Sequence, residues 1–498
     1  MLFNSVEFIF LFFPIVFLAY VYLSKRQPGW AIAWLSLASL FFYSWWDISN
    51  LPILLISIAF NFYIGKSINE RRGASKRQAL NILRFGIVLN LLALGYYKYA
   101  HFLANEGFRL FDVALSVPHI ELPIGISFFT FTQIAFLVDT YRGEVDECNS
   151  VHYSLFVGYF PHLIAGPILH HKEMMPQFKN VVIPSVFSDD FRNGMSIFLI
   201  GLAKKLLIAD SLGNYANYFF NGVASGGTPT FFDSATGVLA YTFQLYFDFS
   251  GYSDMAVGIS LMLGIRLPIN FNSPYKAKNV IDFWRRWHIT LSRFLRDYLY
   301  IALGGNRNGA TRRYLNLFIT MLLGGLWHGA GWTFLLWGAL HGIFLAINHF
   351  WRHLTGRFAM LGKASSAISW IYVPLTFISV VLAWIAFRAA SLADFYSVLR
   401  GVCGLNGFTL PSQIVAIIPK ASSWIEGRGV VPLLADGTVM GFVELIILLL
   451  IVSCVTWCFK NSNDMSTNRR LLVAVMLAPL LIQKIFFGGD VEFLYFQF

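Results

Sequence analysis

Long apolar runs separated by short polar stretches dominate the chain. They lie near residues 8–23, 30–46, 51–64, 82–97, 122–138, 153–168, 195–212, 235–249, 255–265, 311–348, 368–387, 439–459 and 471–487. A helix of about 20 apolar residues spans the hydrocarbon core of a bilayer. The pattern therefore predicts an all-α polytopic membrane protein, with about eleven to thirteen membrane helices. We expect a single transmembrane domain that covers residues 1–498.

The composition agrees with a chain that lies in lipid. Hydrophobic residues make up 57% of the 498 residues and charged residues only 13%, whereas ordinary globular domains carry about 25% charged residues. A soluble protein with so little charge would expose large apolar patches and aggregate. The net charge of +11 comes mainly from Lys and Arg between the apolar runs, where they meet anionic membrane lipids. We expect no nucleic-acid partner, because no nucleic-acid motif accompanies this charge.

Basic residues after the first and third apolar runs predict the orientation of the chain. Lys25 and Arg26 follow the first run, and Arg71, Arg72 and Lys76 follow the third. Loops rich in Lys and Arg stay in the cytoplasm, so the N-terminus is expected outside. The first run has neither a basic leader nor a small-residue cleavage site, which predicts a retained span rather than a cleaved signal.

The apolar stretch at residues 311–348 carries His328 near its middle, within the sequence GGLWHGAGW. A titratable group at membrane depth is costly and is by default a functional-site hypothesis. The neighbouring glycines lower helix stability but allow backbone or a ligand to approach closely. The alternative is a packed, hydrogen-bonded histidine. His341 follows thirteen residues later, about 20 Å along one helix, so it is not expected to share a small site with His328, whereas His288 can do so by folding back.

Residues 265–314 form a basic and aromatic segment that differs from its surroundings. If this segment is helical, its arginines lie mostly beside or opposite one largely apolar side of the helix. That side is formed by Ile281, Trp284, Trp287, His288, Leu291 and Leu295. This pattern is typical of an interfacial or re-entrant amphipathic helix. A plain cytoplasmic helix on anionic headgroups is the alternative. Residues 401–434 form the longest candidate extramembrane loop.

Three polar clusters interrupt the apolar sequence and hold the candidate site residues. The candidates for substrate binding are Gln244, Tyr246, Asp248, Ser250, Asp254, Trp284, Arg285, Arg286, Trp287 and Trp327. Carboxylates between apolar runs must be paired or hydrated. A histidine at membrane depth can act as a general base on a hydroxyl. Arginines and Trp N–H groups can bind an anionic carrier or a developing oxyanion.

Breaks in the apolar runs, and the absence of metal-binding, serine-hydrolase and phosphate-binding motifs, limit the classes of function that the chain can have. One run is broken at Pro161 and at Gly166-Pro167, and such breaks are tolerated in a membrane only where they are buried in protein or line a wet cavity. The four cysteines show no metal spacing, and no metal site is expected. Neither a Gly-x-Ser-x-Gly motif nor a phosphate-cradling loop occurs, which disfavours serine hydrolysis and ATP-driven transport.

Several motifs occur in order along nearly the whole chain. They are residues 123–129 (PIGISFF), 139–142 (DTYR), 165–168 (AGPI), 244–254, 284–292, 326–329 (LWHG), 404–407 (GLNG) and 495–498 (YFQF). This set resembles the membrane-bound O-acyltransferase family, in the bacterial branch typified by the membrane component of alginate O-acetylation. The chain departs from that pattern at His162, where glutamine is expected after Phe160-Pro161.

The resemblance implies a helical bundle with re-entrant and interfacial helices around a central tunnel. It implies that His328 is the catalytic histidine and that His288 is a second functional histidine nearby. In related proteins an activated acyl group arrives from the cytoplasm and moves through the tunnel toward an acceptor on the outer face. We therefore expect a multi-pass protein of the bacterial inner membrane, with no bound cofactor and with acetyl-CoA or an acyl carrier protein as the acyl donor.

The expected function is an acyltransferase for O-acetylation of an extracellular or periplasmic polysaccharide, as in alginate or other exopolysaccharide biosynthesis. The expected partners are a periplasmic or extracellular acetyltransferase with its own serine nucleophile and a polysaccharide synthase complex. Two alternatives stay open. One is a non-catalytic channel or transporter for an acylated carrier, and the other is a D-alanyl or lipid acyltransferase of the same family.

Overall fold

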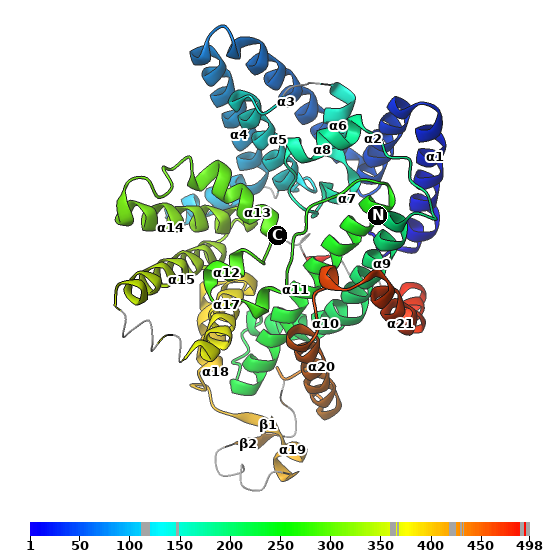
Figure 1. The fold of residues 1–498 in the computed structure, drawn as a ribbon. Helices are drawn as coiled ribbons and strands as arrows, with labels where there is room; N and C mark the ends of the chain where they lie inside the picture. The colour runs from blue at the N-terminus through cyan, green and yellow to red at the C-terminus, as the bar shows by residue number, and fades with distance from the viewer. Residues whose placement is uncertain are drawn as a thin grey trace.

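The protein is a bundle of helices with one small pair of strands (Figure 1). The computed structural model describes residues 1–110, 120–145, 149–358, 365, 368–417, 425–428, 431, 433–488 and 493–494. Its elements are η1 (Phe8–Phe12), α1 (Phe13–Arg26), α2 (Pro28–Ser44), η2 (Ile48–Asn50), α3 (Leu51–Arg72), α4 (Lys76–Leu110), α5 (Ile126–Arg142), α6 (Ser150–Gly158), α7 (Phe160–Leu163), α8 (His171–Lys179), α9 (Asp189–Ala203), η3 (Lys204–Ala209), α10 (Asp210–Ala224), α11 (Phe231–Met262), η4 (Pro274–Lys276), α12 (Val280–Trp284), α13 (Ile289–Phe294), η5 (Leu295–Tyr300), α14 (Gly309–His328), α15 (Trp332–Arg357), η6 (Ser369–Ile371), α17 (Tyr372–Arg388), α18 (Leu392–Val402), β1 (Thr409–Pro411), α19 (Ser412–Ile417), β2 (Glu426–Arg428), α20 (Val439–Cys458), η8 (Ser462–Asp464) and α21 (Thr467–Phe487). The closing motif at residues 495–498 and Cys148 lie outside the described residues.

Seven helical stretches of the described chain are long and apolar enough to cross a membrane. They are Phe8–Arg26, Ile48–Arg72, Lys76–Glu106, Trp332–Arg357, Ser369–Arg388, Val439–Cys458 and Thr467–Phe487. These stretches confirm the all-α polytopic class. The larger count of about eleven to thirteen stays a prediction, because other expected runs form helices such as α5 and α11 whose residues are mostly buried inside the protein.

Local capping explains where several helices begin. The side chains of Asn149, Ser188 and Thr438 accept hydrogen bonds from first-turn N–H groups of α6, α9 and α20. Thr230 and Asp233 form a reciprocal capping box at the start of α11. These oxygen atoms satisfy N–H groups that have no partner within their own helix, so each cap fixes the residue at which the helix starts.

Helix α11 is longer than the hydrophobic pattern predicts. The pattern places a polar cluster between two apolar runs, whereas Phe231–Met262 is one continuous helix that includes the cluster. The prediction of separate runs is wrong because buried neighbours, and not water, surround the polar residues, so the helix needs no break there. In Figure 1, α11 passes through the middle of the molecule, and it packs against α9 and α10.

Helices α14 and α15 form an antiparallel hairpin whose turn follows His328. Helix α14 ends at His328 and α15 begins at Trp332. The two helices cross closely (Figure 1), since a Cβ atom on Gly338 would lie 2.5 Å from the Met321 carbonyl oxygen. The expectation that His341 lies about 20 Å from His328 along one helix is therefore wrong, because the chain reverses between them.

The basic segment at residues 265–314 is not one amphipathic helix. Helices α12 and α13 are separated by a bend in which His288 has a φ of 41°. A left-handed residue cannot continue a right-handed helix, so the predicted continuity is wrong. The predicted apolar side is nevertheless present, since Trp284, Trp287 and Leu291 are all buried.

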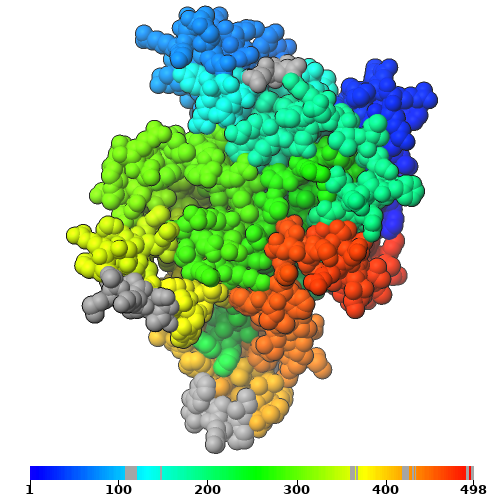
Figure 2. All heavy atoms as spheres, in the orientation of Figure 1, coloured from blue at the N-terminus to red at the C-terminus, as the bar shows by residue number. Residues whose placement is uncertain are grey.

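The candidate extramembrane loop at residues 401–434 contains regular structure. Strands β1 and β2 pair in parallel, with Thr409 opposite Glu426, and α19 lies between them in sequence. Strands β1 and β2 and helix α19 lie at the lower end of the molecule in Figure 1, beyond α18 and α20. Figure 2, in the same orientation, shows residues coloured green across the centre of this face and residues coloured orange at its lower end.

Candidate active site

His328 closes α14 and lies among aromatic side chains. Only 6% of the residue is exposed. Its ring centroid lies 4.9 Å from that of Trp327, 5.0 Å from Trp337 on α15 and 5.1 Å from Phe387 on α17. Three elements therefore enclose the imidazole, which faces the protein interior and not the lipid.

His288 is completely buried at the bend between α12 and α13. Its ring lies edge-on to Phe249 of α11, with the centroids 4.7 Å apart. A positive φ is uncommon for a residue with a side chain, and such strain is retained only where the surrounding structure fixes it. The bend turns the His288 ring toward α11, which a continuous helix would not do.

A chain of hydrogen bonds fixes the protonation of His288. The Ile168 N–H donates to Thr290 Oγ1 at 2.9 Å, and Thr290 donates to Asn270 Oδ1 from both its hydroxyl (2.9 Å) and its N–H (3.3 Å). His288 Nδ1 lies 3.1 Å from the same Oδ1 and must donate to it. Nε2 then carries the lone pair, and it has no hydrogen-bond partner among the described residues. His288 thus offers a basic nitrogen inside the protein.

His341 is also completely buried, on α15. Its Nδ1 accepts a hydrogen bond from Trp284 Nε1 at 3.3 Å. Its ring centroid lies 4.8 Å from that of Trp337, the residue that contacts His328 from the other side. One tryptophan therefore separates His341 from His328, and His341 belongs to the same site.

The fold brings three histidines together. Aromatic rings connect them: His328 and His341 both pack on Trp337. The ring of His288 lies 6.3 Å from that of Phe271, which lies 5.1 Å from the ring of Trp287. Trp384 of α17 links their surroundings, because its ring centroid lies 4.9 Å from Trp287 and 6.0 Å from His341. The segment around His288 therefore folds back toward His328, as predicted. Within the described part of the chain, no group of three or more His, Cys, Asp or Glu side chains is placed to hold a metal ion.

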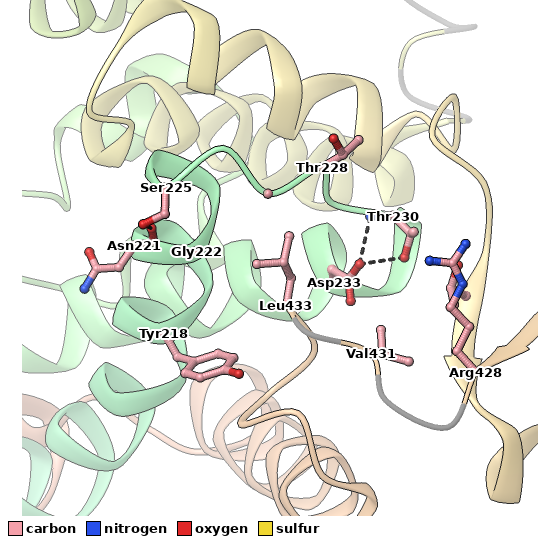
Figure 3. Close-up of a pocket in the computed structure, with 12 residues that line it drawn as sticks. Tyr218, Asn221, Gly222, Ser225, Thr228, Thr230, Asp233, Arg428, Val431 and Leu433 are labelled. Atoms are coloured by element: carbon pink, nitrogen blue, oxygen red, sulfur yellow. Dashed lines mark hydrogen bonds between the residues drawn. The ribbon is translucent and has the colours of Figure 1, made fainter.

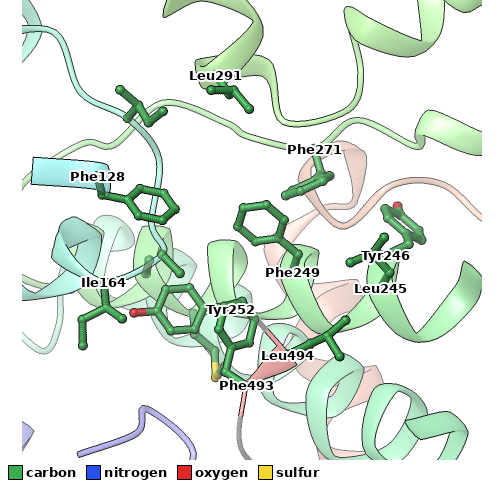
Figure 4. Close-up of a cluster of buried hydrophobic side chains, with 14 of the residues drawn as sticks. Phe128, Ile164, Leu245, Tyr246, Phe249, Tyr252, Phe271, Leu291, Phe493 and Leu494 are labelled. Carbon is green, nitrogen blue, oxygen red and sulfur yellow. The ribbon is translucent and has the colours of Figure 1, made fainter. Parts of the chain in front are cut away.

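Figure 4 shows a cluster of buried side chains that includes Phe249 of α11, the residue whose ring contacts His288. Tyr252 stacks on Phe493, close to the C-terminus, with the ring centroids 4.7 Å apart. The N–H of Leu494 donates to the Asp248 carboxylate at 2.9 Å. The described part of the C-terminal segment thus reaches the interior of the bundle next to α11.

The two carboxylates of the polar cluster on α11 are paired with lysines. Lys205 lies 2.8 Å from Asp248, and Lys204 lies 2.6 Å from Asp254. Both lysines belong to the π-helical turn η3, which packs against α11. This confirms that carboxylates in an apolar setting need partners.

The other predicted polar residues of α11 lie in different neighbourhoods. The ring of Tyr246 is 6.3 Å from that of Trp287 and so belongs to the surroundings of the histidines. Gln244 lies against Gly213 of α10 instead. Ser250 is completely buried. The sequence predicts one polar cluster, but a helix directs successive residues to different sides.

The predicted arginines also differ from one another. Arg286 pairs with Asp282 at 2.9 Å. Arg285 is exposed and forms no ion pair with the residues that the structure describes. Three other arginines of the basic segment are paired: Arg266 with Asp190, Arg293 with Glu173 and Arg296 with Asp297. Four of the ten Lys and Arg residues of this segment are thus paired with carboxylates, and Arg285 is among those left available to an anionic group.

Two residues beside His328 were not predicted, Lys98 and Tyr99 of α4. The Lys98 ammonium donates to the carbonyl oxygens of Trp327 (2.5 Å) and His328 (3.0 Å). The Tyr99 hydroxyl donates to the carbonyl oxygen of Leu326 at 2.8 Å. The available signal is a lone lysine in a predominantly apolar helix, because such a charge needs a partner.

The pocket in Figure 3 lies elsewhere in the molecule, where α10, the start of α11 and the strands meet. Its volume is about 680 Å³, and it is lined by Tyr218, Asn221, Gly222, Ser225, Gly227, Thr228, Thr230, Asp233, Thr409, Arg428, Val431 and Leu433. Asp233 accepts hydrogen bonds there from the N–H and hydroxyl of Thr230, at 2.8 and 2.7 Å. None of the predicted site residues lines this pocket.

The fold and the site together define a polytopic membrane protein with a buried histidine centre. The sequence profile of the membrane-bound O-acyltransferase family matches residues 40–392. The chain belongs to this family and is therefore an acyltransferase.

Relatives of three kinds match all or part of the chain. The peptidoglycan O-acetyltransferase of Helicobacter pylori is 39% identical over 537 residues, which cover 100% of this chain and 98% of the relative. The probable alginate O-acetylase AlgI of Pseudomonas aeruginosa is 45% identical over 397 residues, covering 79% of this chain and 73% of the relative. The teichoic acid D-alanyltransferase of Streptococcus thermophilus is 29% identical over 236 residues, which cover 46% of this chain and 57% of the relative. These matches confirm the predicted resemblance to the alginate-type branch.

Proposed function

We propose that this protein takes an acetyl group from a cytoplasmic thioester donor and relays it across the inner membrane, for O-acetylation of a polysaccharide on the outer side. The donor is acetyl-CoA or an acyl carrier protein. The partners are a periplasmic or extracellular acetyltransferase and the complex that makes the polymer. The observation that carries the proposal is that His328 and His288 are both buried in one interior, connected by the packed rings of Phe271, Trp287, Trp384 and Trp337.

The position of His328 along the helices supports transfer to the outer side. Lys98, which contacts the His328 carbonyl, lies about 33 Å along α4 from Lys76. The positive-inside rule assigns Lys76 to the cytoplasm, and the hydrocarbon core is about 30 Å thick. His328 is then expected near the outer side of the membrane, where the acceptor would be.

The chemistry of the transfer follows from the groups around the histidines. An imidazole nitrogen takes the proton of an acceptor hydroxyl while the hydroxyl oxygen attacks the thioester carbonyl carbon. The C–S bond then breaks, and the departing thiolate takes the proton. In this scheme His328 is the general base or proton shuttle, and His288 orients the donor or assists through Nε2. Exposed Arg285 and the basic segment recruit the anionic donor.

Replacement of His328 tests the proposal. His328→Ala is expected to lower polymer acetylation by at least about a hundredfold at equal abundance in the membrane, because general acid–base catalysis contributes on the order of 10²–10⁴. The measurement is the acetyl content of the polymer from cells that carry each variant. His353→Ala is the matched control, since His353 is an exposed histidine of α15. Normal acetylation with His328→Ala would remove this histidine from the mechanism.

A channel without a covalent step is the alternative that broken helices favour. The helix breaks between α6 and α7, and the non-helical residues 164–170 that follow are all buried. Radiolabelled acetyl donor and the purified protein, without its partner, distinguish the two functions. Transfer of label to a hydroxyl acceptor or to the protein supports an enzyme, and transport of intact donor without transfer supports a channel.

A further inference from the structure

The C-terminal end of α14 needs hydrogen-bond donors from outside the helix. The last carbonyl groups of any α-helix have no partner within it, and α14 ends at His328. These carbonyls carry the negative end of the helix dipole, which favours a cation. Buried carbonyls left without donors would destabilise the last turn, which is the turn that holds the histidine.

Helix α4 supplies these donors from residues far away in the sequence. Lys98 Nζ lies 2.5 Å from the Trp327 carbonyl oxygen and 3.0 Å from that of His328, 229 and 230 positions along the chain. Its third contact is with Ser127 Oγ, at 3.4 Å. Tyr99 adds a hydrogen bond to the next carbonyl, that of Leu326, at 2.8 Å. Three consecutive carbonyls are therefore held by two neighbouring side chains.

The geometry of Lys98 differs from that of a solvated surface lysine. Each of its described contacts is with a backbone carbonyl or a hydroxyl. Its ammonium also lies 5.9 Å from the centroid of the Trp327 ring, which stacks on Phe131 at 5.0 Å. Holding these two successive carbonyls fixes the peptide planes on both sides of His328. The direction in which the His328 side chain leaves the backbone is fixed with them.

We propose that Lys98 is a positioning residue for acyl transfer: it clamps the last turn of α14 and so holds the His328 imidazole in its reactive position. The role of His328 in this inference rests on the proposed function, whereas the clamp itself is a structural property. Lys98 does not touch the reacting groups, since its hydrogen atoms are directed at the α14 carbonyls and Ser127. Its loss is therefore expected to slow the reaction without weakening donor binding.

The test uses the full-length protein in lipid nanodiscs, with wild type and three lysine variants. Lys98→Met keeps the length of the side chain but removes its hydrogen-bond donors and its charge. Lys98→Arg keeps the donors and the charge. Lys66→Met is the matched control, because Lys66 is an exposed lysine on the neighbouring helix α3. For each variant, kcat and the KM for acetyl-CoA are measured with a hydroxyl acceptor. Deuterium uptake is measured for peptides that cover residues 322–331.

Lys98→Met is expected to lower kcat by about tenfold to a hundredfold, with KM changed by less than about twofold, because a small misplacement of a reacting group has this effect. It should also raise deuterium uptake at residues 322–331 and nowhere else. Lys98→Arg should restore part of the kcat and part of the protection from deuterium uptake. Lys66→Met should change neither kcat nor deuterium uptake. Unchanged uptake with Lys98→Met overturns the clamp, and raised uptake with normal kcat overturns the positioning role. If wild type transfers no acyl group, the proposed function fails, and deuterium uptake alone decides the clamp.

Discussion

At the scale of the residue, His288 owes its chemistry to one amide side chain. Asn270 Oδ1 receives two hydrogen bonds from Thr290, and this leaves His288 Nδ1 only the role of donor. The lone pair is thereby placed on Nε2, the nitrogen with no partner among the described residues. The orientation of a base by a second group is a recurring feature of histidine catalysis.

Asn270→Ala should therefore lower acyl transfer while the protein stays folded. The expected loss is about tenfold to a hundredfold, as is typical when the group that orients a functional histidine is removed. The rate of acetyl transfer by the purified protein at equal abundance is the measurement. Asn272→Ala is the control, because Asn272 lies two residues further on and is exposed. A normal rate with Asn270→Ala would show that the His288 tautomer is not needed.

At the scale of the element, the α14–α15 hairpin places His328 and His341 on two sides of Trp337. The hairpin is close because glycines lie at the crossing: a Cβ on Gly325 would lie 2.3 Å from the Phe334 carbonyl oxygen. Small residues that let two backbones approach are typical of helix pairs in membranes. The glycines that lower the helix propensity of this stretch are thus required by the packing of its two halves.

Gly338→Ala should separate these helices, because the added methyl group would lie 2.5 Å from the Met321 carbonyl oxygen. The expected loss of stability is about 1–3 kcal/mol, the usual effect of overpacking. The measurement is the thermal unfolding midpoint of the purified protein in detergent. Gly356→Ala, on the same helix, should not lower the midpoint, since nothing lies within 4 Å of its added Cβ. Equal midpoints for the two variants would contradict the close crossing.

At the scale of the whole molecule, contacts between distant segments hold basic residues near helix ends, which the positive-inside rule assigns to the cytoplasmic face. Arg72 donates to the Thr140 carbonyl at 3.1 Å, and Gln177 bonds to the backbone of Arg266, four residues after the end of α11. Helix α11 is 32 residues long, about 48 Å, which exceeds the thickness of a hydrocarbon core of about 30 Å. Its first residues, beside the pocket of Figure 3, therefore belong to the opposite face.

Cysteine labelling in intact cells tests this orientation. In a variant without native cysteines, Ile48→Cys and Ser225→Cys should react with a membrane-impermeant maleimide, because both positions are exposed and are assigned to the outer face. Gln27→Cys, next to Lys25 and Arg26, should react only after the membrane is permeabilised. If instead Gln27→Cys reacted in intact cells and the other two variants reacted only after permeabilisation, the topology would be inverted. The side from which the acyl donor binds would then be opposite to the one proposed.

The sequence predicts the class of the molecule well, because the relevant signals are local. The length of an apolar run and the scarcity of charge decide whether a segment enters a membrane, whatever its neighbours are. The ordered motifs point to the family, and the prediction that His328 and His288 are its functional histidines rests on the same motifs. The broken run at Pro161 and Gly166 is also visible in the sequence, since proline and glycine interrupt helices locally.

The sequence signals for the roles of Lys98 and Asn270 were weaker than those for the two histidines. Lys98 is a lone cation that looks like the flank of a membrane span, and Asn270 lies in a loop of ordinary composition. Their roles depend on what they contact, and those partners lie 229 and 18 positions away. No periodicity in a single segment reports such contacts.

By itself, the sequence determined that this chain is a helical membrane protein of the acyltransferase family, because hydrophobic run length and motif order do not depend on how the helices pack. Only the tertiary structure decided that α14 reverses after His328, that His341 joins the site across Trp337, and that Lys98 holds the end of α14. The physical reason is that these features rest on contacts between helices, and such contacts are set by close packing and by buried hydrogen bonds that form only once the helices have assembled.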